Sequence, residues 1–335
     1  ALLLFLNNIK IMKILVTGGL GFIGAHLVKK LLDHKHKVLV FDNLSTIGGI
    51  IYKNPKSSFI KGDLVYSKDV KKIEKWKPQV IYHLAAQSGG ESAYINPMKD
   101  YLSNGFGTYN LCKIAKKLKV KHFIYGSSVA VYGSSPKKKI NELSKINPDS
   151  IYGVSKFAGE MFINQELKKT KIKTTILRIF NTYGPGENLN YQKKGMVSIY
   201  CSYIWKKKPI IVKGTLNRVR DVTFIDDAVN VLYETLSNKK LKKNEVINLS
   251  SGNSFTVKEL LKEILTSCGK KNYKIVITKS TPGDSKIFHT SNRKLKKKYP
   301  NIKFTPIKIG LKKYFNWINK IPNNKNLKHF HPFNL

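Results

Sequence analysis

Arginine is scarce in this strongly basic chain of 335 residues. Of its 61 basic residues only four are arginine (Arg178, Arg218, Arg220 and Arg293), and 20 acidic residues leave a formal net charge of +41. Such a charge could attract nucleic acid, but specific recognition of bases and phosphates favours the arginine fork, and no recognition motif is present. We interpret the lysines, which are spread along the whole chain, as a solvated surface that attracts anions generally. A nucleic-acid-binding protein stays as the alternative from another functional class.

Cysteine is also scarce, and no apolar run is long enough to span a bilayer. The three cysteines, Cys112, Cys201 and Cys268, are isolated in the sequence. Isolation of this kind argues against a disulfide framework and for buried thiols in a reducing compartment, so we expect a cytoplasmic protein. The histidines lack the spacing of metal ligands, and we expect no metal site. Ala1 to Leu6 is apolar, but it is too short and lacks the basic flank of a signal peptide.

A glycine-rich loop indicates a nucleotide site. Residues 12–17 have the composition of a short buried strand, Gly18-Gly19-Leu20-Gly21-Phe22-Ile23-Gly24 follows, and a helical pattern then runs to Leu32. Glycines at this spacing allow a pyrophosphate to approach the free N–H groups at the start of the helix. A second strand, 37–41, is followed by Asp42, at the distance expected for a carboxylate that binds ribose. Because this carboxylate would repel the extra phosphate of NADP, the pattern predicts NAD.

Five tyrosines stand four residues before a lysine, and chance alone would give about three such pairs in so lysine-rich a chain. Tyr152 and Lys156 are the pair whose position makes chemical sense, because they open a predicted helix soon after the strand end at Ser127-Ser128. A lysine one helical turn away favours the phenolate, which lets a tyrosine act as a base. Tyr109 has the same spacing from Lys113 on another predicted helix, before the central strand.

Strand-like and helix-like segments alternate along most of the chain. We expect strands at 13–17, 37–41, 58–60, 79–83, 121–127 and 174–180, and helices at 22–32, 70–76, 101–118 and 150–168. In the last third, helices are expected at 195–207 and 256–265 and a strand at 209–212. Such alternation predicts an α/β protein with a Rossmann-type, doubly wound parallel sheet and a smaller C-terminal α/β domain.

Further motifs follow one another in a fixed order, as in a known family, from about residue 12 to 318. They are Gly62-Asp63-Leu64, His83-Leu84-Ala85-Ala86-Gln87, Asn104 with Gly107-Thr108, Ser127-Ser128 with Val131-Tyr132-Gly133, Tyr152-Gly153 with Ser155-Lys156, Leu177-Arg178-Ile179-Phe180-Asn181, Arg220-Asp221, Ile247-Asn248-Leu249 and Pro282-Gly283-Asp284. With the glycine loop, this series resembles the extended short-chain dehydrogenase/reductases. Within them it is similar to the NAD-dependent epimerases and dehydratases of nucleotide sugars, and most to enzymes of the UDP-glucose 4-epimerase type.

The resemblance implies roles for the matching residues. Ser128, Tyr152 and Lys156 would be catalytic, with Ser128 bonding the reacting hydroxyl of the sugar. The residues expected to bind or support NAD are Gly18, Gly21, Phe22, Ile23, Gly24, Asp42, Asn43, Asp63, Leu64, Leu84, Ala85, Ala86, Gln87, Asn104, Ser127, Tyr152 and Lys156. The substrate would contact Ser128, Asn181, Arg220 and Asp284, with Asn181 and Arg220 at its phosphates.

The resemblance also implies an order of domains and an assembly. It implies that 12–186 binds NAD, with 218–248 returning to that domain. Because the first strand pattern begins at Met12, we expect 1–11 to be an extension outside the fold, and the composition of 321–335 predicts a tail. Residues 187–217 and 249–320 would form the nucleotide-sugar-binding domain. Helices 101–118 and 150–168 carry apolar residues on more than one stripe, and in the resembling family they pair across a two-fold axis, so we expect a homodimer.

Two residues that depart from the family pattern bear on the nucleotide, and a missing pair of acidic residues bears on the choice of reaction. Thr281 stands where many UDP-sugar enzymes have a diphosphate-binding arginine, and Ile179 where an aromatic residue often lies beside the nicotinamide, which weakens UDP as the nucleotide. Val129 and Ala130 stand where a 4,6-dehydratase needs an acid and a base to expel water. We therefore expect a 4-epimerase that works through a 4-keto sugar without net oxidation. A dehydratase or reductase of the same family, and an NAD-binding protein without catalysis, stay as alternatives.

Overall fold

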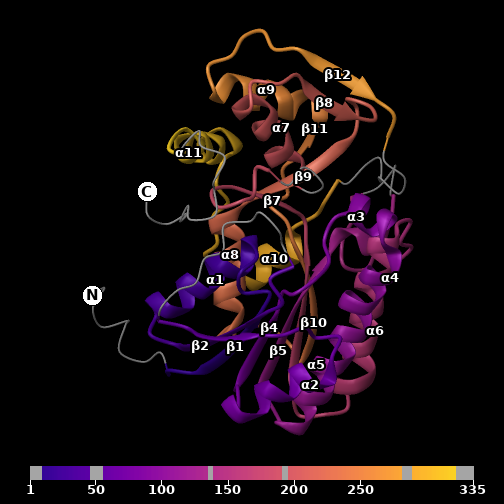
Figure 1. Ribbon diagram of the computed structural model, residues 1–335, viewed down its shortest axis with the longest axis vertical. Helices are drawn as coiled ribbons and strands as arrows, with labels where there is room; N and C mark the ends of the chain where they lie inside the picture. Colours follow the sequence, from indigo (N-terminus) through magenta and orange to yellow (C-terminus); the bar gives the residue numbers. More distant parts are fainter. Residues whose placement is uncertain (1–9, 46–55, 135–138, 191–194, 281–288, 322–335) are drawn as a thin grey trace.

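The computed structural model describes residues 10–45, 56–134, 139–190, 195–280 and 289–321. Its main sheet has seven strands, all parallel, in the order β10-β6-β5-β4-β1-β2-β3 (Figure 1). They are β1 (Lys13–Thr17), β2 (Lys37–Asp42), β3 (Ser58–Lys61), β4 (Val80–His83), β5 (His122–Ser128), β6 (Lys173–Ile179) and β10 (Asn244–Leu249). The order reverses at β1, which lies between β2 and β4, so the sheet is doubly wound as predicted. Each predicted strand agrees with its observed bounds to within one residue at either end, and β10 is an addition.

Helices cover both faces of this sheet because the strand side chains alternate between two cores. On one face, Ile14, Val16 and neighbouring strand residues pack against α1 (Phe22–Asp33), α8 (Ile225–Thr235) and α10 (Arg293–Lys298). On the other face, Leu15, Leu39 and their neighbours pack against α2 (Ser67–Val70), α5 (Gly107–Lys117) and α6 (Ile151–Leu167). The fully buried strands read as near-continuous apolar runs, which is typical of parallel sheets.

Two predicted helices differ in form from the expectation. The predicted helix at 70–76 is instead the short α2 followed by a 3₁₀ helix, η2 (Lys71–Trp76), which ends at Lys77 in the left-handed conformation. The predicted helix at 101–118 begins as a π-helix, η3 (Tyr101–Phe106), that continues α4 (Pro97–Asp100) and leads into α5. A π-turn widens the helix locally and is often found at functional sites, and here it contains the buried Asn104.

A smaller α/β part lies beyond the carboxyl ends of the main sheet, at the top of Figure 1. It contains a three-stranded sheet of β7 (Asn181–Tyr183), β9 (Val219–Phe224) and β11 (Ser254–Thr256), and a pair formed by β8 (Ile210–Lys213) and β12 (Ile275–Thr278). Its helices are α7 (Met196–Trp205), α9 (Val257–Ser267) and α11 (Ile307–Asn319), which enclose a core of their own. Of the segment 218–248, α8 and β10 lie on the main sheet, whereas β9 belongs to the smaller part; the exact domain boundaries stay a prediction.

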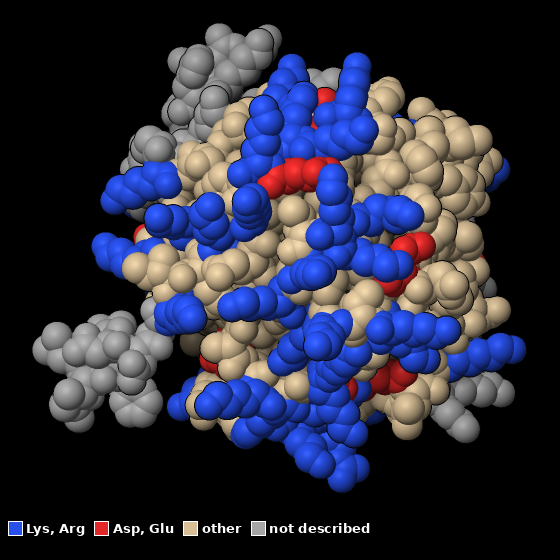
Figure 2. Space-filling view, turned by 90° about the horizontal axis from the view of Figure 1, so that it is seen from below, with Lys and Arg blue, Asp and Glu red and all other residues tan. Residues whose placement is uncertain are grey.

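Charge is spread widely over the outside. Lysines begin β1, β2 and β6, and Lys121 directly precedes β5. Figure 2, which views the molecule from below, shows lysine and arginine side chains scattered over that face with few acidic ones between them. Within the described ranges no helix has the length and apolarity needed to cross a membrane, and no group of His, Cys, Asp and Glu could hold a metal ion.

Candidate active site

A cleft of about 850 Å³ opens at the carboxyl ends of the main sheet, where α7, β8 and β9 of the smaller part form its far wall. In doubly wound sheets this edge, near the reversal of strand order, is where ligands bind. Most predicted site residues line the cleft: Gly18, Gly21, Phe22, Ile23, Gly24, Asp42, Asn43, Asp63, Leu64, Leu84, Ala85, Ala86, Gln87, Ser127, Ser128, Tyr152, Lys156, Asn181 and Arg220. Asn104 lies behind the wall, and Asp284 falls outside the described residues.

The glycine loop is shaped for close approach. Gly18 has a φ of +68°, and a Cβ there would lie 2.6 Å from the backbone nitrogen of Ala85. A Cβ at Gly24 would lie 2.1 Å from the carbonyl oxygen of Gly18, so glycine is needed for α1 to begin this near to β1. The cap residue Gly21 offers no side-chain hydrogen bond, and the first turn of α1 lines the cleft. These N–H groups can therefore hold the pyrophosphate of a dinucleotide.

Two carboxylates lie at the ends of neighbouring strands. Asp42, the last residue of β2, accepts backbone N–H bonds from Leu20 (3.0 Å) and Leu44 (2.9 Å), and so ties the glycine loop to the strand. Burial raises the pKa of Asp42, and these two bonds lower it in part. Asp63, beyond the end of β3, accepts a bond of 2.9 Å from the side-chain amide of Asn43. This arrangement fits the adenosine half of NAD.

Ser128, Tyr152 and Lys156 meet on the wall of the cleft. Ser128 ends β5, accepts a bond of 3.2 Å from the N–H of Ala130, and hydrogen-bonds the phenol of Tyr152. Ser150 caps α6 by accepting a bond of 3.1 Å from the N–H of Gly153, and the helix then carries Tyr152 and Lys156 one turn apart. A Cβ on Gly153 would lie 2.4 Å from the carbonyl oxygen of Ala130, so this glycine lets the helix start approach the strand end.

Burial dominates the ionisation of the tyrosine and the lysine. It raises the pKa of Tyr152 to about 12, although the bond from Ser128 lowers it in part. It lowers the pKa of Lys156 to about 7, against the opposing effect of Asp100 and Glu160. The Nζ of Lys156 also lies 4.3 Å from the centroid of the Tyr125 ring. Both pKa shifts favour the neutral form, because burial in a low-dielectric site disfavours charge. A positive charge bound beside the phenol would favour the phenolate and so lower the pKa of Tyr152.

Asn104 supports the site from behind. Its side-chain amide donates to the carbonyl oxygen of Gln87 (2.9 Å) and lies 3.0 Å from the hydroxyl of Ser155 and 3.2 Å from the carboxylate of Asp100. The Ser155 hydroxyl donates to the same carboxylate at 2.6 Å. Since Ser155 is the neighbour of Lys156 on α6, this group connects the π-helix, the cleft wall at Gln87 and the helix that carries Tyr152 and Lys156.

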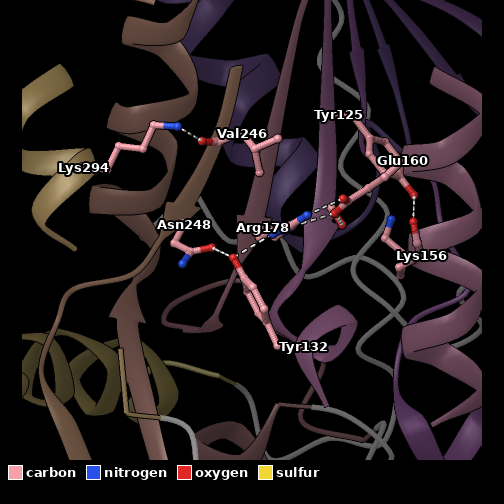
Figure 3. Close-up of polar contacts among 9 residues, drawn as sticks. Tyr125, Tyr132, Lys156, Glu160, Arg178, Val246, Asn248 and Lys294 are labelled. Atoms are coloured by element: carbon pink, nitrogen blue, oxygen red, sulfur yellow. Dashed lines mark hydrogen bonds and ion pairs between the residues drawn. The ribbon is translucent and has the colours of Figure 1, made fainter. Parts of the chain in front are cut away.

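A buried ion pair holds α6 to the strands beneath it (Figure 3). Arg178 on β6 donates from Nε (2.9 Å) and Nη2 (2.7 Å) to the carboxylate of Glu160 on α6, which also accepts a bond of 2.5 Å from Ser127. Arg178 donates from Nη1 to the phenol oxygen of Tyr132 (2.8 Å), and that phenol donates to Asn248 (2.7 Å). The sequence motifs did not predict this network. One pattern could have indicated that Glu160 lies near the site, because Glu160 follows Lys156 by four residues and so shares its helix face.

The other tyrosine–lysine pairs differ from the Tyr152 pair. Tyr109 on α5 packs its ring against Phe106 and Phe162 and is not among the cleft-lining residues. Tyr203 lines the cleft, but α7 ends at Trp205, before Lys207. Tyr299 is buried against Thr235, and Tyr52 falls outside the described residues. Among the pairs that the structure describes, only Tyr152 and Lys156 both line the cleft and lie on one helix.

Three comparisons with known proteins identify the family of this chain. The profile of the NAD dependent epimerase/dehydratase family matches residues 14–250. A proposed UDP-glucose 4-epimerase of Methanocaldococcus jannaschii is 32% identical over 310 residues, which cover 91% of this chain and 98% of its own. The structure of the UDP-glucose 4-epimerase of Thermotoga maritima with UDP-glucose has a TM-score of 0.86 and 29% identity, over 92% of this chain and 99% of that chain. That of the UDP-glucuronic acid 4-epimerase of Bacillus cereus, with UDP-glucuronic acid and NAD, has a TM-score of 0.83 and 27% identity, over 92% and 99%. The chain therefore belongs to the NAD dependent epimerase/dehydratase family, as its motifs predicted.

Proposed function

We propose that this protein is an NAD-dependent nucleotide-sugar 4-epimerase that acts on a UDP-sugar. One observation carries the proposal: Ser128, Tyr152 and Lys156 share a cleft with a dinucleotide-binding loop, while Val129 and Ala130 after the serine have no acidic group. The residues needed to remove a proton from a sugar hydroxyl are therefore present in the cleft. The acid and the base that loss of water would need at positions 129 and 130 are not.

Residues of the cleft divide between the two ligands. The first turn of α1 would hold the pyrophosphate of NAD, and Asp42 with Asp63 its adenosine half. When bound, NAD supplies a hydride acceptor and a positively charged ring near the phenol. The far wall, with Asn181 and Arg220, would hold the phosphates of the sugar nucleotide. The two relatives whose structures contain UDP-sugars support UDP as the nucleotide.

Tyr152, Ser128 and Lys156 would carry out the proton transfer. The phenol of Tyr152 would take the proton from the fourth hydroxyl of the sugar, which Ser128 would orient through its hydroxyl. For this the pKa of Tyr152 must fall well below its value of about 12 in the ligand-free site. An ammonium at Lys156, one helical turn away, acts in that direction. After the keto-sugar turns its other face to the ring, Tyr152 would return the proton to the reduced oxygen.

The reaction class can be tested with a panel of UDP-, dTDP-, CDP- and GDP-sugars. Chromatography should show interconversion of one epimeric pair, and mass spectrometry should show a product of unchanged mass. Absorbance near 340 nm should not exceed about one equivalent of cofactor per enzyme, since hydride returns in each cycle. A product about 18 Da lighter would mean a dehydratase instead. Salt-dependent RNA binding without turnover would favour the nucleic-acid alternative.

We infer that the protein forms a cytoplasmic homodimer through α3 (Gly90–Ile95), α4, η3 and α6. Leu111, Ile114 and Leu167 of the predicted apolar stripes are buried in the core. A second apolar face is exposed, and it consists of Tyr94, Ile95, Met98, Tyr101, Leu102, Phe106, Val154 and Met161. The helices that carry these residues pack against one another, and exposed large apolar side chains gathered in this way indicate a protein interface. Light scattering tests the inference, because a monodisperse mass near 38 kDa at micromolar concentration would contradict the dimer.

A further inference from the structure

A buried carboxylate lies behind the cleft wall, next to the helix that carries Tyr152 and Lys156. Asp100 is the last residue of α4 and is 0% exposed. Its Oδ2 accepts a bond of 2.6 Å from the hydroxyl of Ser155 and lies 3.2 Å from the side-chain amide nitrogen of Asn104. Burial raises the pKa of Asp100, and these two donors, with the charge of Lys156, lower it in part.

One oxygen of this carboxylate has no hydrogen bond. The Oδ1 atom of Asp100 is buried, and within the described ranges no group donates to it. A buried charge that is only half bonded is costly unless a charge of opposite sign lies near it. Lys156 supplies that charge. Burial lowers the pKa of Lys156 to about 7, and two carboxylates oppose this fall, Asp100 more than Glu160.

Glu160, the other buried carboxylate near the lysine, already has a partner (Figure 3). It accepts two bonds from Arg178, at 2.9 and 2.7 Å, so the charges of this pair largely cancel. Asp100 contacts α6 at Ser155, the neighbour of Lys156. Asp100 is therefore the carboxylate whose charge is left to balance the ammonium.

The remaining titratable groups around Lys156 add little charge. On β5, the ring of Tyr125 lies against the Nζ of Lys156, and burial raises the pKa of its phenol well above the ordinary value, so it is neutral. On β4, burial lowers the pKa of His83 well below the ordinary value, and so does the charge of Lys156, so this imidazole is neutral too. On α3, Glu91 lines the cleft but is paired with Lys213 at 2.6 Å.

We propose that Asp100 is a positioning residue of the catalytic site, which holds α6 through Ser155 and balances the charge of the Lys156 ammonium. The inference rests on the proposed function, because it presupposes that Tyr152 and Lys156 act on a sugar hydroxyl. The two residues are active when the phenol has lost its proton and the ammonium has kept its own, so their protons leave in two coupled steps. Burial is the main influence on both pKa values, and the negative charge of Asp100 raises both, so both steps lie at higher pH. Lys156 then stays charged at the pH at which the phenol ionises.

Titration of the Tyr152 phenol in the NAD-saturated protein tests this role. The ultraviolet absorbance of the phenolate is followed against pH, and each protein is compared with its own Tyr152→Phe counterpart to isolate one tyrosine. Asp100→Asn keeps an oxygen for the bond from Ser155 and can place its NH2 at the unbonded position, so the charge is the main loss. The phenol should then titrate roughly one pH unit lower. Asp33→Asn is the matched control, because it makes the same change in an exposed residue of α1 and should leave the titration in place.

The same change should move the pH profile of turnover. With a nucleotide sugar that the wild type epimerises, both limbs of the bell-shaped profile of kcat should lie roughly one pH unit lower in Asp100→Asn. Ser155→Ala breaks the bond to the carboxylate but keeps its charge, so it should lower kcat and leave the limbs in place. A purely structural Asp100 would lower kcat in both variants without moving either limb.

The outcomes separate this role from the proposed function. An unmoved phenol titration in Asp100→Asn would overturn the role of Asp100, whatever happens to turnover. If Asp100→Asn does not fold, Asp100→Ser, which also removes the charge, decides by the same titration. The titration needs NAD but no sugar, so a wild type that epimerises no nucleotide sugar would overturn the proposed function and not the charge effect of Asp100.

Discussion

The two ends of the main sheet carry positive charge in different forms. At the carboxyl end, Arg178, Arg218 and Arg220 are buried, and each donates a hydrogen bond of 2.8–3.2 Å that helps to fix its guanidinium. At the amino end, Lys37, Lys121 and other lysines are exposed to solvent. Fixed, forked charges can recognise a ligand, whereas mobile charges in water only attract anions weakly. The few arginines therefore say more about function than the net charge of +41 does.

The largest expected effect comes from Tyr152, the proposed catalytic base at the carboxyl end of the sheet. Tyr152→Phe removes only the phenolic oxygen and should lower turnover by about 10²- to 10⁴-fold or more, because the general base is lost. NAD binding and the melting temperature should stay nearly unchanged. Tyr109→Phe makes the same change in a tyrosine that packs among Phe106 and Phe162, and it should alter turnover little. Steady-state kinetics would reject the site if Tyr109 were essential and Tyr152 dispensable.

The buried ion pair of α6 should contribute more to stability than any exposed pair. Glu160→Gln leaves Arg178 buried without its counter-ion, which should lower the free energy of unfolding by about 3–5 kcal/mol. Glu166→Gln on the same helix breaks a more exposed pair with Lys116, at 3.4 Å, and should cost about 0–1 kcal/mol. Urea unfolding measures both. Equal losses in the two variants would show that burial of the pair does not matter.

The carboxylate at the end of β2 should set the choice of cofactor. Asp42→Asn should weaken NAD binding by roughly tenfold and remove most of the discrimination against NADP, since a charge-assisted bond and a repulsion are lost together. Asp33→Asn removes an equal charge from an exposed pair with Lys29 on α1 and should change neither affinity. Fluorescence titration with both cofactors provides the measurement. Tighter binding of NADP than of NAD by the wild type would move the ribose contact away from Asp42.

Local patterns predicted most of the fold and most of the residues that line the cleft, but not the contacts behind the cleft wall. The strands follow from apolar runs, and the glycine loop from a motif whose steric need is visible at Gly18 and Gly24. The π-helix at Tyr101–Phe106 has no signature in apolar spacing, and its Asn104 bonds to residues that are distant in sequence. Arg178 meets Glu160 only after β6 and α6 are in place. The partners of these contacts lie 17 to 51 residues apart, so the contacts depend on how the elements pack and not on local pattern.

The buried lysine should make stability depend on pH. The pKa of Lys156 falls from its ordinary value of 10.5 to about 7 on burial. Between these values the unfolded chain binds a proton at Lys156 that the folded chain does not, so the stability of the ligand-free protein should rise as pH rises through this range. Lys156→Met lacks the titrating amine and should lack this part of the rise. Urea unfolding of both proteins from about pH 7 to 10 checks it, and parallel curves would contradict the shift.

The smallest effects should come from the lysines at the amino end of the sheet. Lys37→Gln and Lys121→Gln each remove an exposed charge far from the cleft, so each should change the free energy of unfolding by no more than about 0.5 kcal/mol. Turnover at physiological salt should stay the same, because exposed charges beyond a Debye length of about 8 Å are screened from the site. At low salt the on-rate of the anionic substrate should fall slightly, since the lysines add to a general attraction. A large loss of turnover in either variant would mean that the amino end takes part in function after all, and the contrast between the two ends would no longer hold.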